Sequence, residues 1–309
     1  MKVSIIGGGG RVGVSAAFAL QCAGIVSEIH LLDANEQAAQ GEALDLLHGA
    51  SAIADQRIYA GGYDRAADAD VVCITAGLRR KPDESRLDLI NRNVTLFRQI
   101  LDSLASARLK ENAIIFVVSN PVDILTRLAI DHLKRCPDRT IGLGTQLDTA
   151  RFRSLIAMEL ELPPTQVTAL ILGEHGDSMV PIWSSAAVAG VPLLKHPGCT
   201  VVFQQKVFER TRTSGAEVIK LKGGAGWAVG LTIAQVIHAI ALNQKMIFPI
   251  STQLAGEYSI KGTCTSLPTV VDKRGVVKRL ELELWPREMA GLVAGAKALD
   301  ATYDKIRGS

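Results

Sequence analysis

Three residues in the second half of the chain have the types and spacing of an acid–base site. His175 lies in the glycine-flanked segment Gly173-Glu174-His175-Gly176-Asp177, directly after an apolar stretch. Histidine is well suited to exchange protons near neutral pH, and loops at strand ends often carry catalytic groups. Asp148 and Arg151 are three residues apart in a helix pattern, so they share one face. Taken alone, Asp148 is explained as an acid that the helix dipole favours, and Arg151 as half of a surface ion pair. Together with His175, the two residues predict a reactive cleft.

A glycine run near the amino terminus has the pattern of a dinucleotide-binding turn. Gly8-Gly9-Gly10-Arg11-Val12-Gly13 fits G-x-G-x-x-G between a strand pattern and a helix pattern. A start at Gly7 is also possible, and we choose the register that ends on Gly13. Glycines let the backbone approach a pyrophosphate, which the helix amino terminus attracts. The alternative interpretation is a flexible glycine turn that binds no ligand.

An acid follows this turn at the spacing that ribose recognition requires. Asp33 comes 20 residues after Gly13 (33 − 13), where its carboxylate can accept both ribose hydroxyls and repel a 2′-phosphate. The alternative is an acid that only caps the next helix. The motif as a whole therefore predicts NAD rather than NADP.

A charged run, Arg79-Arg80-Lys81-Pro82-Asp83-Glu84-Ser85-Arg86, follows the apolar stretch 71–75. Open α/β sheets bind ligands outside the carboxyl ends of their strands. Four cations beside a nucleotide site indicate an anionic substrate, although a lone run of this kind is usually a solvated surface.

The elements that must position these residues alternate through the first half of the chain. Strand patterns occupy residues 2–6, 28–32, 57–60, 71–75 and 113–119, and helix patterns such as 11–23 and 36–48 separate them. This alternation predicts right-handed βαβ units, hence an α/β fold with an N-terminal Rossmann doubly wound parallel sheet.

The pattern changes beyond residue 144. Helix patterns occupy residues 147–160, 201–219, 227–241 and 287–306, and strand patterns occupy 167–172 and parts of 245–284. We expect an NAD-binding domain over residues 1–145 and a C-terminal mixed α/β substrate-binding and catalytic domain over residues 146–309.

Composition limits the partners. The 309 residues are 48% hydrophobic and 21% charged with a net charge of +3, which favours a small-molecule substrate over nucleic acid. Five scattered cysteines indicate neither disulfides nor a metal site. No signal peptide or membrane-spanning run is visible, so we expect a cytoplasmic protein without membrane contact.

These motifs together resemble the lactate/malate dehydrogenase family over nearly the whole chain. The matching stretches are Gly8–Gly13, Asp33, Ala76-Gly77 with Arg80–Asn93, Ser119-Asn120-Pro121-Val122-Asp123, Gly144–Arg153, Gly173–Asp177 and Gly256-Glu257-Tyr258. The resemblance implies an NAD cofactor whose site comprises Gly8, Gly10, Arg11, Val12, Gly13, Asp33, Thr75, Ala76, Gly77, Asn93, Ser119 and Asn120.

The resemblance also implies catalytic roles. His175 exchanges the substrate hydroxyl proton, and Asp148 fixes its tautomer and favours the imidazolium. Arg151 grips the substrate carboxylate in a bidentate pair. Arg86, on a loop that closes, polarises the ketone oxygen, and Asn120 hydrogen-bonds at the same centre.

The expected substrate depends mainly on Arg80. It stands where the family's malate enzymes have arginine and lactate enzymes have glutamine, and Ala225 replaces the threonine common in lactate enzymes. We therefore expect a malate dehydrogenase of the tricarboxylic acid cycle that interconverts (S)-malate and oxaloacetate. Glu84, Glu174 and Trp183-Ser184-Ser185 instead look like the lactate branch.

Several alternatives stay open. They are an L-lactate dehydrogenase or a broad-specificity 2-hydroxy acid dehydrogenase, an NAD-using glycosidase of related fold, and a catalytically silent NAD-binding regulator. The family suggests a homotetramer or homodimer, with the apolar helix patterns 14–23 and 227–241 serving either an interface or the core.

Overall fold

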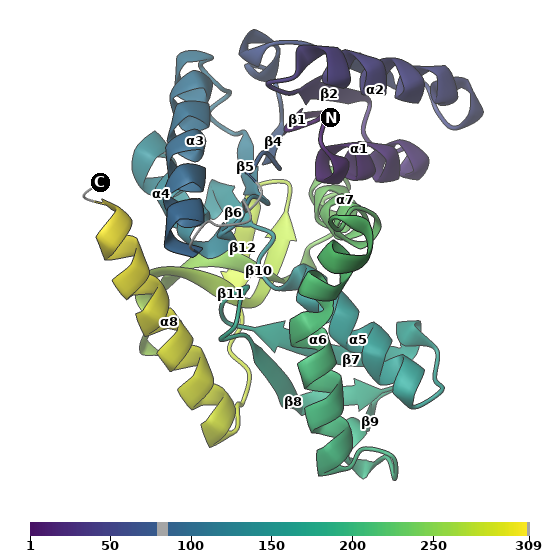
Figure 1. Ribbon diagram of the computed structural model, residues 1–309, viewed down its shortest axis with the longest axis vertical. Coiled ribbons are helices and arrows are strands. Elements are labelled where there is room, and N and C mark those ends of the chain that lie inside the picture. Colours follow the sequence, from purple (N-terminus) through teal and green to yellow (C-terminus); the bar gives the residue numbers. More distant parts are fainter. Residues whose placement is uncertain (79–85, 308–309) are drawn as a thin grey trace.

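The computed structural model describes residues 1–78 and 86–307, and within them nine strands form one sheet (Figure 1). The spatial order is β12-β11-β10-β6-β5-β4-β1-β2-β3. The strands from β1 to β6 are parallel and span Lys2–Ile6, Glu28–Leu32, Arg57–Ala60, Val71–Ile74, Ile114–Val117 and Thr140–Gly142. Their order, 3-2-1-4-5-6, is that of a dinucleotide-binding sheet. The predicted doubly wound parallel sheet is confirmed.

Helices cover both faces of this sheet because its strands are apolar on both sides. Successive side chains of a strand point to opposite faces. In β4, Val71 and Cys73 join a core with α1, α2 and α7, whereas Val72 and Ile74 join a core with α3, α4 and α8. These helices span Arg11–Ala23, Glu36–Gly49, Trp227–Ala241, Arg86–Ser106, Val122–Leu133 and Pro286–Arg307, respectively.

The sheet continues into the C-terminal half of the chain. Strand β10 (Met246–Ala255) pairs antiparallel with β6 through Ser251 and Gly142, and β11 (Lys261–Asp272) and β12 (Gly275–Arg279) extend the edge. The predicted β-rich stretch after residue 245 therefore extends the Rossmann sheet instead of forming one of its own.

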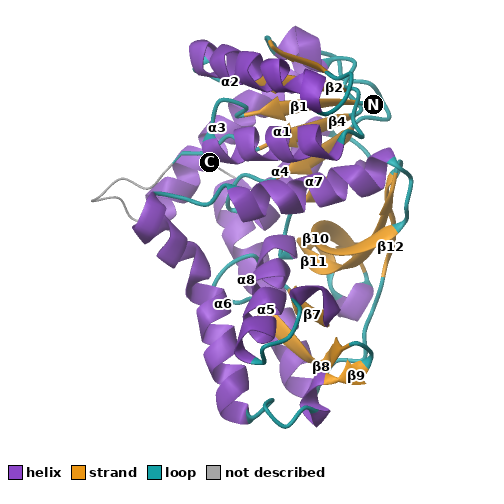
Figure 2. Cartoon of the chain, turned by 90° about the vertical axis from the view of Figure 1, so that its right-hand side faces the viewer, coloured by secondary structure: helices purple, strands orange, loops and turns teal. Residues whose placement is uncertain are grey.

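A smaller antiparallel sheet lies beyond this edge, and Figure 2 shows it at the end of the molecule remote from β1. It comprises β7 (Val167–Leu172), β8 (Val180–Val188) and β9 (Val191–Pro192). Helices α5 (Gln146–Glu159) and α6 (Val201–Lys222) pack on it, with Phe152 meeting Trp183 edge to face at 4.9 Å. We predicted no strand over residues 180–188, where Pro181 near the start lacks the N–H that a ladder uses.

None of the helices in the described part of the chain is both long enough and apolar enough to cross a bilayer. The division at residue 145 stays a prediction.

Candidate active site

The glycine turn lies at the carboxyl edge of the parallel sheet, between β1 and α1. Gly7 has a φ of +90°, and a Cβ on it would lie 2.6 Å from the amide nitrogen of Ala76. A Cβ on Gly13 would lie 2.3 Å from the carbonyl oxygen of Gly7, and one on Gly8 would lie 2.8 Å from Cβ of Leu31. The turn therefore tolerates no side chain at these points. We chose the register that ends on Gly13, which leaves out Gly7, and the positive φ of Gly7 is not visible in a run of glycines.

Asp33 closes the turn from the end of β2. Its Oδ2 accepts a hydrogen bond from the amide of Gly9 at 3.1 Å, and its Oδ1 accepts one from the amide of Asn35 at 3.0 Å. The carboxylate is thus fixed beside the glycines. A turn free of side chains, an α1 amino terminus and a fixed acid fit the pyrophosphate and ribose of NAD.

The remaining predicted cofactor residues gather where β4 and β5 end. The hydroxyl of Thr75 donates to the carbonyl of Ile6 at 3.0 Å, and that of Ser119 donates to the carbonyl of Ala76 at 2.5 Å. Asn93 of α3 accepts from the amide of Leu78 at 2.8 Å, so it holds the chain after Gly77. Asn120 follows Ser119 on an exposed turn. The structure therefore brings Thr75, Ala76, Asn93 and Ser119 beside the glycine turn.

Asp148 joins the two cationic groups of the predicted cleft. Its Oδ2 lies 2.5 Å from Nδ1 of His175, and its Oδ1 accepts a hydrogen bond from Nη1 of Arg151 at 3.0 Å. The side chain of Asp148 is 1% exposed, whereas those of His175 and Arg151 are 21% and 17% exposed. The buried acid therefore orients two partly open groups, and among the described residues Nε2 of His175 and the other guanidinium nitrogens of Arg151 make no hydrogen bond.

The electrostatics favour a charged pair. Burial opposes protonation of His175, but the charge and hydrogen bond of Asp148 outweigh it and raise the pKa of the imidazole above 6.5. Burial also acts to raise the pKa of Asp148, yet His175 and Arg151 hold it below 3.8. His175 is thus able to keep a proton near neutral pH and deliver it to a ligand.

Hydrogen bonds between elements place α5 against the strand that precedes His175. The hydroxyl of Thr145 donates to the carbonyl of Ile171 at 2.5 Å, and the amide of Ile171 donates to the hydroxyl of Thr149 at 2.9 Å. Gly173 pairs with Ser266 of β11 through two hydrogen bonds of 3.0 Å. The loop of His175 and the helix of Asp148 are therefore held to the same framework.

Asp123 of α4 is a functional candidate to which we assigned no role. It is 2% exposed, and its Oδ2 accepts a hydrogen bond from the backbone amide of His175 at 2.8 Å. Burial raises its pKa to about 6, while the Ser251 hydroxyl and His175 oppose this rise. The available signal was its place in the segment Ser119-Asn120-Pro121-Val122-Asp123, which resembles the family.

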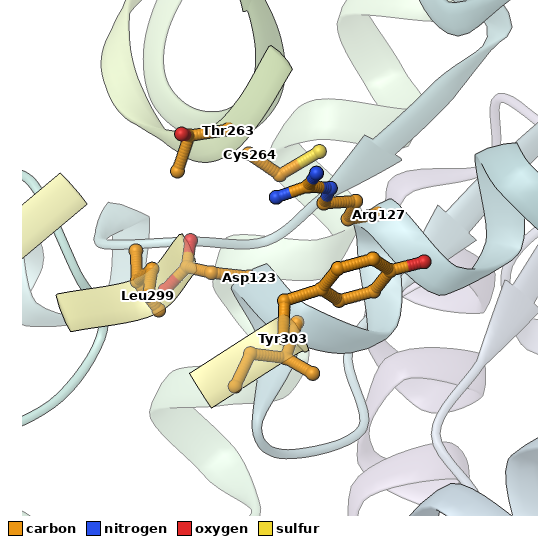
Figure 3. Close-up of a pocket in the computed structure, with 7 residues that line it drawn as sticks. Asp123, Arg127, Thr263, Cys264, Leu299 and Tyr303 are labelled. Atoms are coloured by element: carbon orange, nitrogen blue, oxygen red, sulfur yellow. The ribbon is translucent and has the colours of Figure 1, made fainter. Parts of the chain in front are cut away.

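A cavity of about 10 Å³ lies behind Asp123, on the side of α8 (Figure 3). Its other labelled lining residues are Arg127, Thr263, Cys264, Leu299 and Tyr303. This volume is about that of one water, so the cavity does not compete with the cleft as a substrate site.

Two predicted residues lie at or beyond the limit of the described chain. Arg80 falls within residues 79–85, outside the described residues, as does most of the cationic run. Arg86 begins α3, but its side chain is likewise outside the described part.

Ala225 lies between α6 and α7 and packs partly buried against the core that α1 and α7 share. Among the described residues, no cluster of three His, Cys, Asp or Glu side chains could hold a metal.

Comparison with known proteins matches both halves of the chain. The family described as lactate/malate dehydrogenase, NAD binding domain, matches residues 1–142, and its alpha/beta C-terminal domain matches residues 145–308. The L-lactate dehydrogenase of Synechococcus sp. (strain JA-3-3Ab) is 37% identical over 99% of this chain and 100% of its own. That of Salinibacter ruber (strain DSM 13855 / M31) is 39% identical over 94% of this chain and 93% of its own.

A solved structure of a lactate dehydrogenase is similar to this chain over nearly its whole length. The minor L-lactate dehydrogenase from Enterococcus mundtii in the ligands-bound form has a TM-score of 0.95 at 35% identity, covering 99% of this chain and 98% of that chain.

The expectation of a malate dehydrogenase, with its place in the tricarboxylic acid cycle, is wrong. The full-length relatives just described are L-lactate dehydrogenases. The expectation depended on Arg80, whose charge Asp83 and Glu84 beside it in sequence can offset. The small side chain of Ala225 adds room but no charge, so it does not select a second carboxylate.

The glycine turn with Asp33, the His175–Asp148–Arg151 arrangement and the matches over both halves lead to one conclusion: the chain belongs to the lactate/malate dehydrogenase family and is an NAD-dependent oxidoreductase.

Proposed function

We propose that this protein is an L-lactate dehydrogenase, which interconverts pyruvate and L-lactate. The observation that carries the proposal is the buried Asp148, which joins one proton-exchanging group and one described carboxylate-binding cation. The names of the full-length relatives support pyruvate as the substrate. NAD, when bound, supplies the hydride acceptor or donor.

His175 holds the proton that the substrate oxygen gains or loses. Its Nδ1 faces Asp148, so the proton that moves is carried on Nε2. Because Asp148 keeps the pKa of His175 raised, the imidazolium is available when pyruvate is reduced. The same carboxylate stabilises the charge that forms on His175 when lactate is oxidised.

Arg151 binds the substrate carboxylate. Its Nη1 is held by Asp148, which limits the rotation of the guanidinium and leaves its other nitrogens for a bidentate contact. A two-point contact orients the 2-oxo group toward His175 as well as binding it. Arg86 and Asn120 remain proposed as groups that polarise and hydrogen-bond the substrate oxygen.

We assign NAD binding to residues 1–145. Gly8, Gly10, Gly13 and Asp33 are supported by their turn geometry, and Thr75, Ala76, Asn93 and Ser119 by their position beside it. Residues 146–309 supply His175, Asp148 and Arg151. Arg11 and Val12 begin α1 and complete the proposed set together with Gly77 and Asn120.

A homotetramer or homodimer and a cytoplasmic location also stay predictions. In the single chain, Phe18 of α1 and Trp227 and Leu231 of α7 are more than half exposed, as an interface would require. Light scattering on the purified protein decides the oligomeric state.

The test is NADH oxidation at 340 nm with pyruvate and with oxaloacetate. We expect the kcat/KM for pyruvate to exceed that for oxaloacetate by about tenfold or more, because Arg151 satisfies one carboxylate. Equal rates with 2-oxobutyrate and longer 2-oxo acids would instead assign a broad-specificity enzyme. A preference for oxaloacetate, lost in Arg80→Gln, would refute the proposal.

A further inference from the structure

Arg11 contacts a part of the protein far from the glycine turn in sequence. Its Nη1 donates hydrogen bonds to the carbonyl oxygens of Lys222 at 2.6 Å and Gly224 at 2.9 Å. Lys222 is the last residue of α6, so the guanidinium caps the carbonyl end of that helix, where a cation is favoured. Within the described residues, Nε and Nη2 of Arg11 make no hydrogen bond, which leaves them for a ligand.

The turn between α6 and α7 rests directly on α1. A Cβ on Gly226 would lie 3.0 Å from Cγ of Arg11 and 2.8 Å from the hydroxyl of Ser15. A Cβ on Gly230 would lie 2.6 Å from the backbone carbon of Ser15. The start of α7 is therefore fixed to α1, and α6 joins this fixed point through the turn that Arg11 binds (Figures 1 and 2).

The same helix reaches the proposed substrate site. A Cβ on Gly215 of α6 would lie 3.7 Å from Nη1 and 3.8 Å from Nη2 of Arg151. Seven residues separate Gly215 from Lys222 (222 − 215). At about 1.5 Å per residue, the two contacts are about 10 Å apart along one helix.

This end of α6 is lightly packed in the single chain. The buried side chains of the helix are Phe203, Val207 and Thr211, all in its first half. In its second half, Ile219 and Leu221 are 60% and 76% exposed. Because none of residues 212–222 is buried, the position of this segment is sensitive to the hydrogen bonds that Arg11 makes at its end.

We propose that Arg11 is a positioning residue that couples NAD binding to the substrate carboxylate site through α6. It lies in the cofactor turn and holds the carboxyl end of α6, whose Gly215 faces Arg151. A ligand that fixes Arg11 therefore also fixes the wall of the Arg151 site. The proposal rests on the proposed function, because it takes Arg151 as the carboxylate-binding group.

The test compares Arg11→Met with the wild-type protein. Methionine retains the apolar stem over Gly226 but loses the donors to Lys222 and Gly224. Arg212→Met is the control, because Arg212 lies on α6 itself but pairs at 3.0 Å with Glu209 on the exposed surface. Arg11→Lys retains the charge without the guanidinium fork.

Two measurements are made on each protein. The first is the Kd of oxamate, an isostere of pyruvate, with and without NADH, by titration calorimetry. The second is amide hydrogen exchange over residues 212–226, with and without NADH. In Arg11→Met we expect NADH to lose about tenfold of its effect on oxamate affinity and to stop protecting these amides, a change typical of coupled sites. Arg212→Met should behave as wild type, and Arg11→Lys should recover part of both effects.

Unchanged oxamate coupling and unchanged protection in Arg11→Met would overturn the proposal. So would weaker NADH binding alone, with coupling and protection preserved at saturating NADH, because Arg11 would then be only a cofactor contact. Should the wild-type protein bind no oxamate, the proposed function fails, and the exchange comparison with NADH still decides the role of Arg11.

Discussion

Replacing Asp148 by asparagine tests the geometry at the centre of the site. The side chain is 1% exposed and faces His175 at 2.5 Å and Arg151 at 3.0 Å, so the substitution leaves two cationic groups without their shared partner. Removing one partner of a buried pair costs about 3–5 kcal/mol. At about 1.4 kcal/mol per tenfold, this predicts a loss of roughly 10² to 10⁴ in kcat/KM for pyruvate.

The pH profile of Asp148→Asn separates this cause from misfolding. Reduction of pyruvate needs protonated His175, so its kcat/KM is flat below the pKa of that group and falls above it. In the wild-type protein Asp148 raises this pKa above 6.5. In the variant, burial and the nearby Arg151 lower the pKa of His175, because Asp148 no longer opposes them. The fall in rate should therefore begin at a lower pH.

The assay is initial-rate NADH oxidation at 340 nm from pH 5.5 to 9, with circular dichroism to verify folding. Asp68→Asn is the control, because Asp68 pairs with Lys2 at the opposite, amino-terminal edge of the sheet. A kcat/KM for pyruvate within threefold of wild type, with an unmoved pH profile, would refute the role assigned to Asp148.

Four further substitutions have distinct expected results. Arg151→Gln should raise the KM for pyruvate by roughly 10²- to 10⁴-fold, since two charge-assisted hydrogen bonds of about 1.5–3 kcal/mol each are lost, while NADH fluorescence titration shows an unchanged Kd. Asp33→Ser should shift the NADH-to-NADPH preference by about tenfold or more toward NADPH in kcat/KM, because the carboxylate no longer binds ribose or repels phosphate. Gly215→Ala should raise the Tm by about 2–4 °C through helix propensity and raise the KM for pyruvate a few-fold, because its methyl group lies 3.7 Å from Arg151; a lower Tm would contradict it. Asp123→Asn should lower the apparent pKa of pyruvate reduction, because the charge of Asp123 helps to raise that of His175, and an unmoved pH profile would count against this.

The parts of the fold that were predictable are those in which local pattern and burial agree. Strand β4 is apolar on both sides, so the sequence shows that both of its faces are covered, and the glycine turn and Asp33 place the crossover that follows β1. Strand β8 was missed because its pairing is a tertiary property that overrides the local effect of Pro181.

The contrast between local pattern and tertiary packing also separates the site residues that were predictable from those that were not. Asp148 and Arg151 meet because helical spacing brings residues three apart together, which is a local rule. Asp123 and His175 are 52 residues apart, and their contact needs α4 and the loop after β7 to pack against each other. Asp123 lies in the first turn of α4, where the helix dipole favours an acid whether or not it has a partner, and so its link to His175 was not predictable.

We attribute the wrong prediction of a malate substrate to the charges around Arg80 in the sequence. A guanidinium selects a second carboxylate only if its charge is not already neutralised, and that depends on every charge within about 4–6 Å. Arg80 is followed within four residues by Asp83 and Glu84, so these acids, rather than the arginine alone, influence the attraction for a dicarboxylate. If this reasoning holds, Asp83→Gly with Glu84→Met should raise kcat/KM for oxaloacetate relative to pyruvate in the NADH oxidation assay, whereas Arg80→Gln in the wild-type background should change that ratio little. A large effect of Arg80→Gln alone would show that the arginine acts independently of its acidic neighbours.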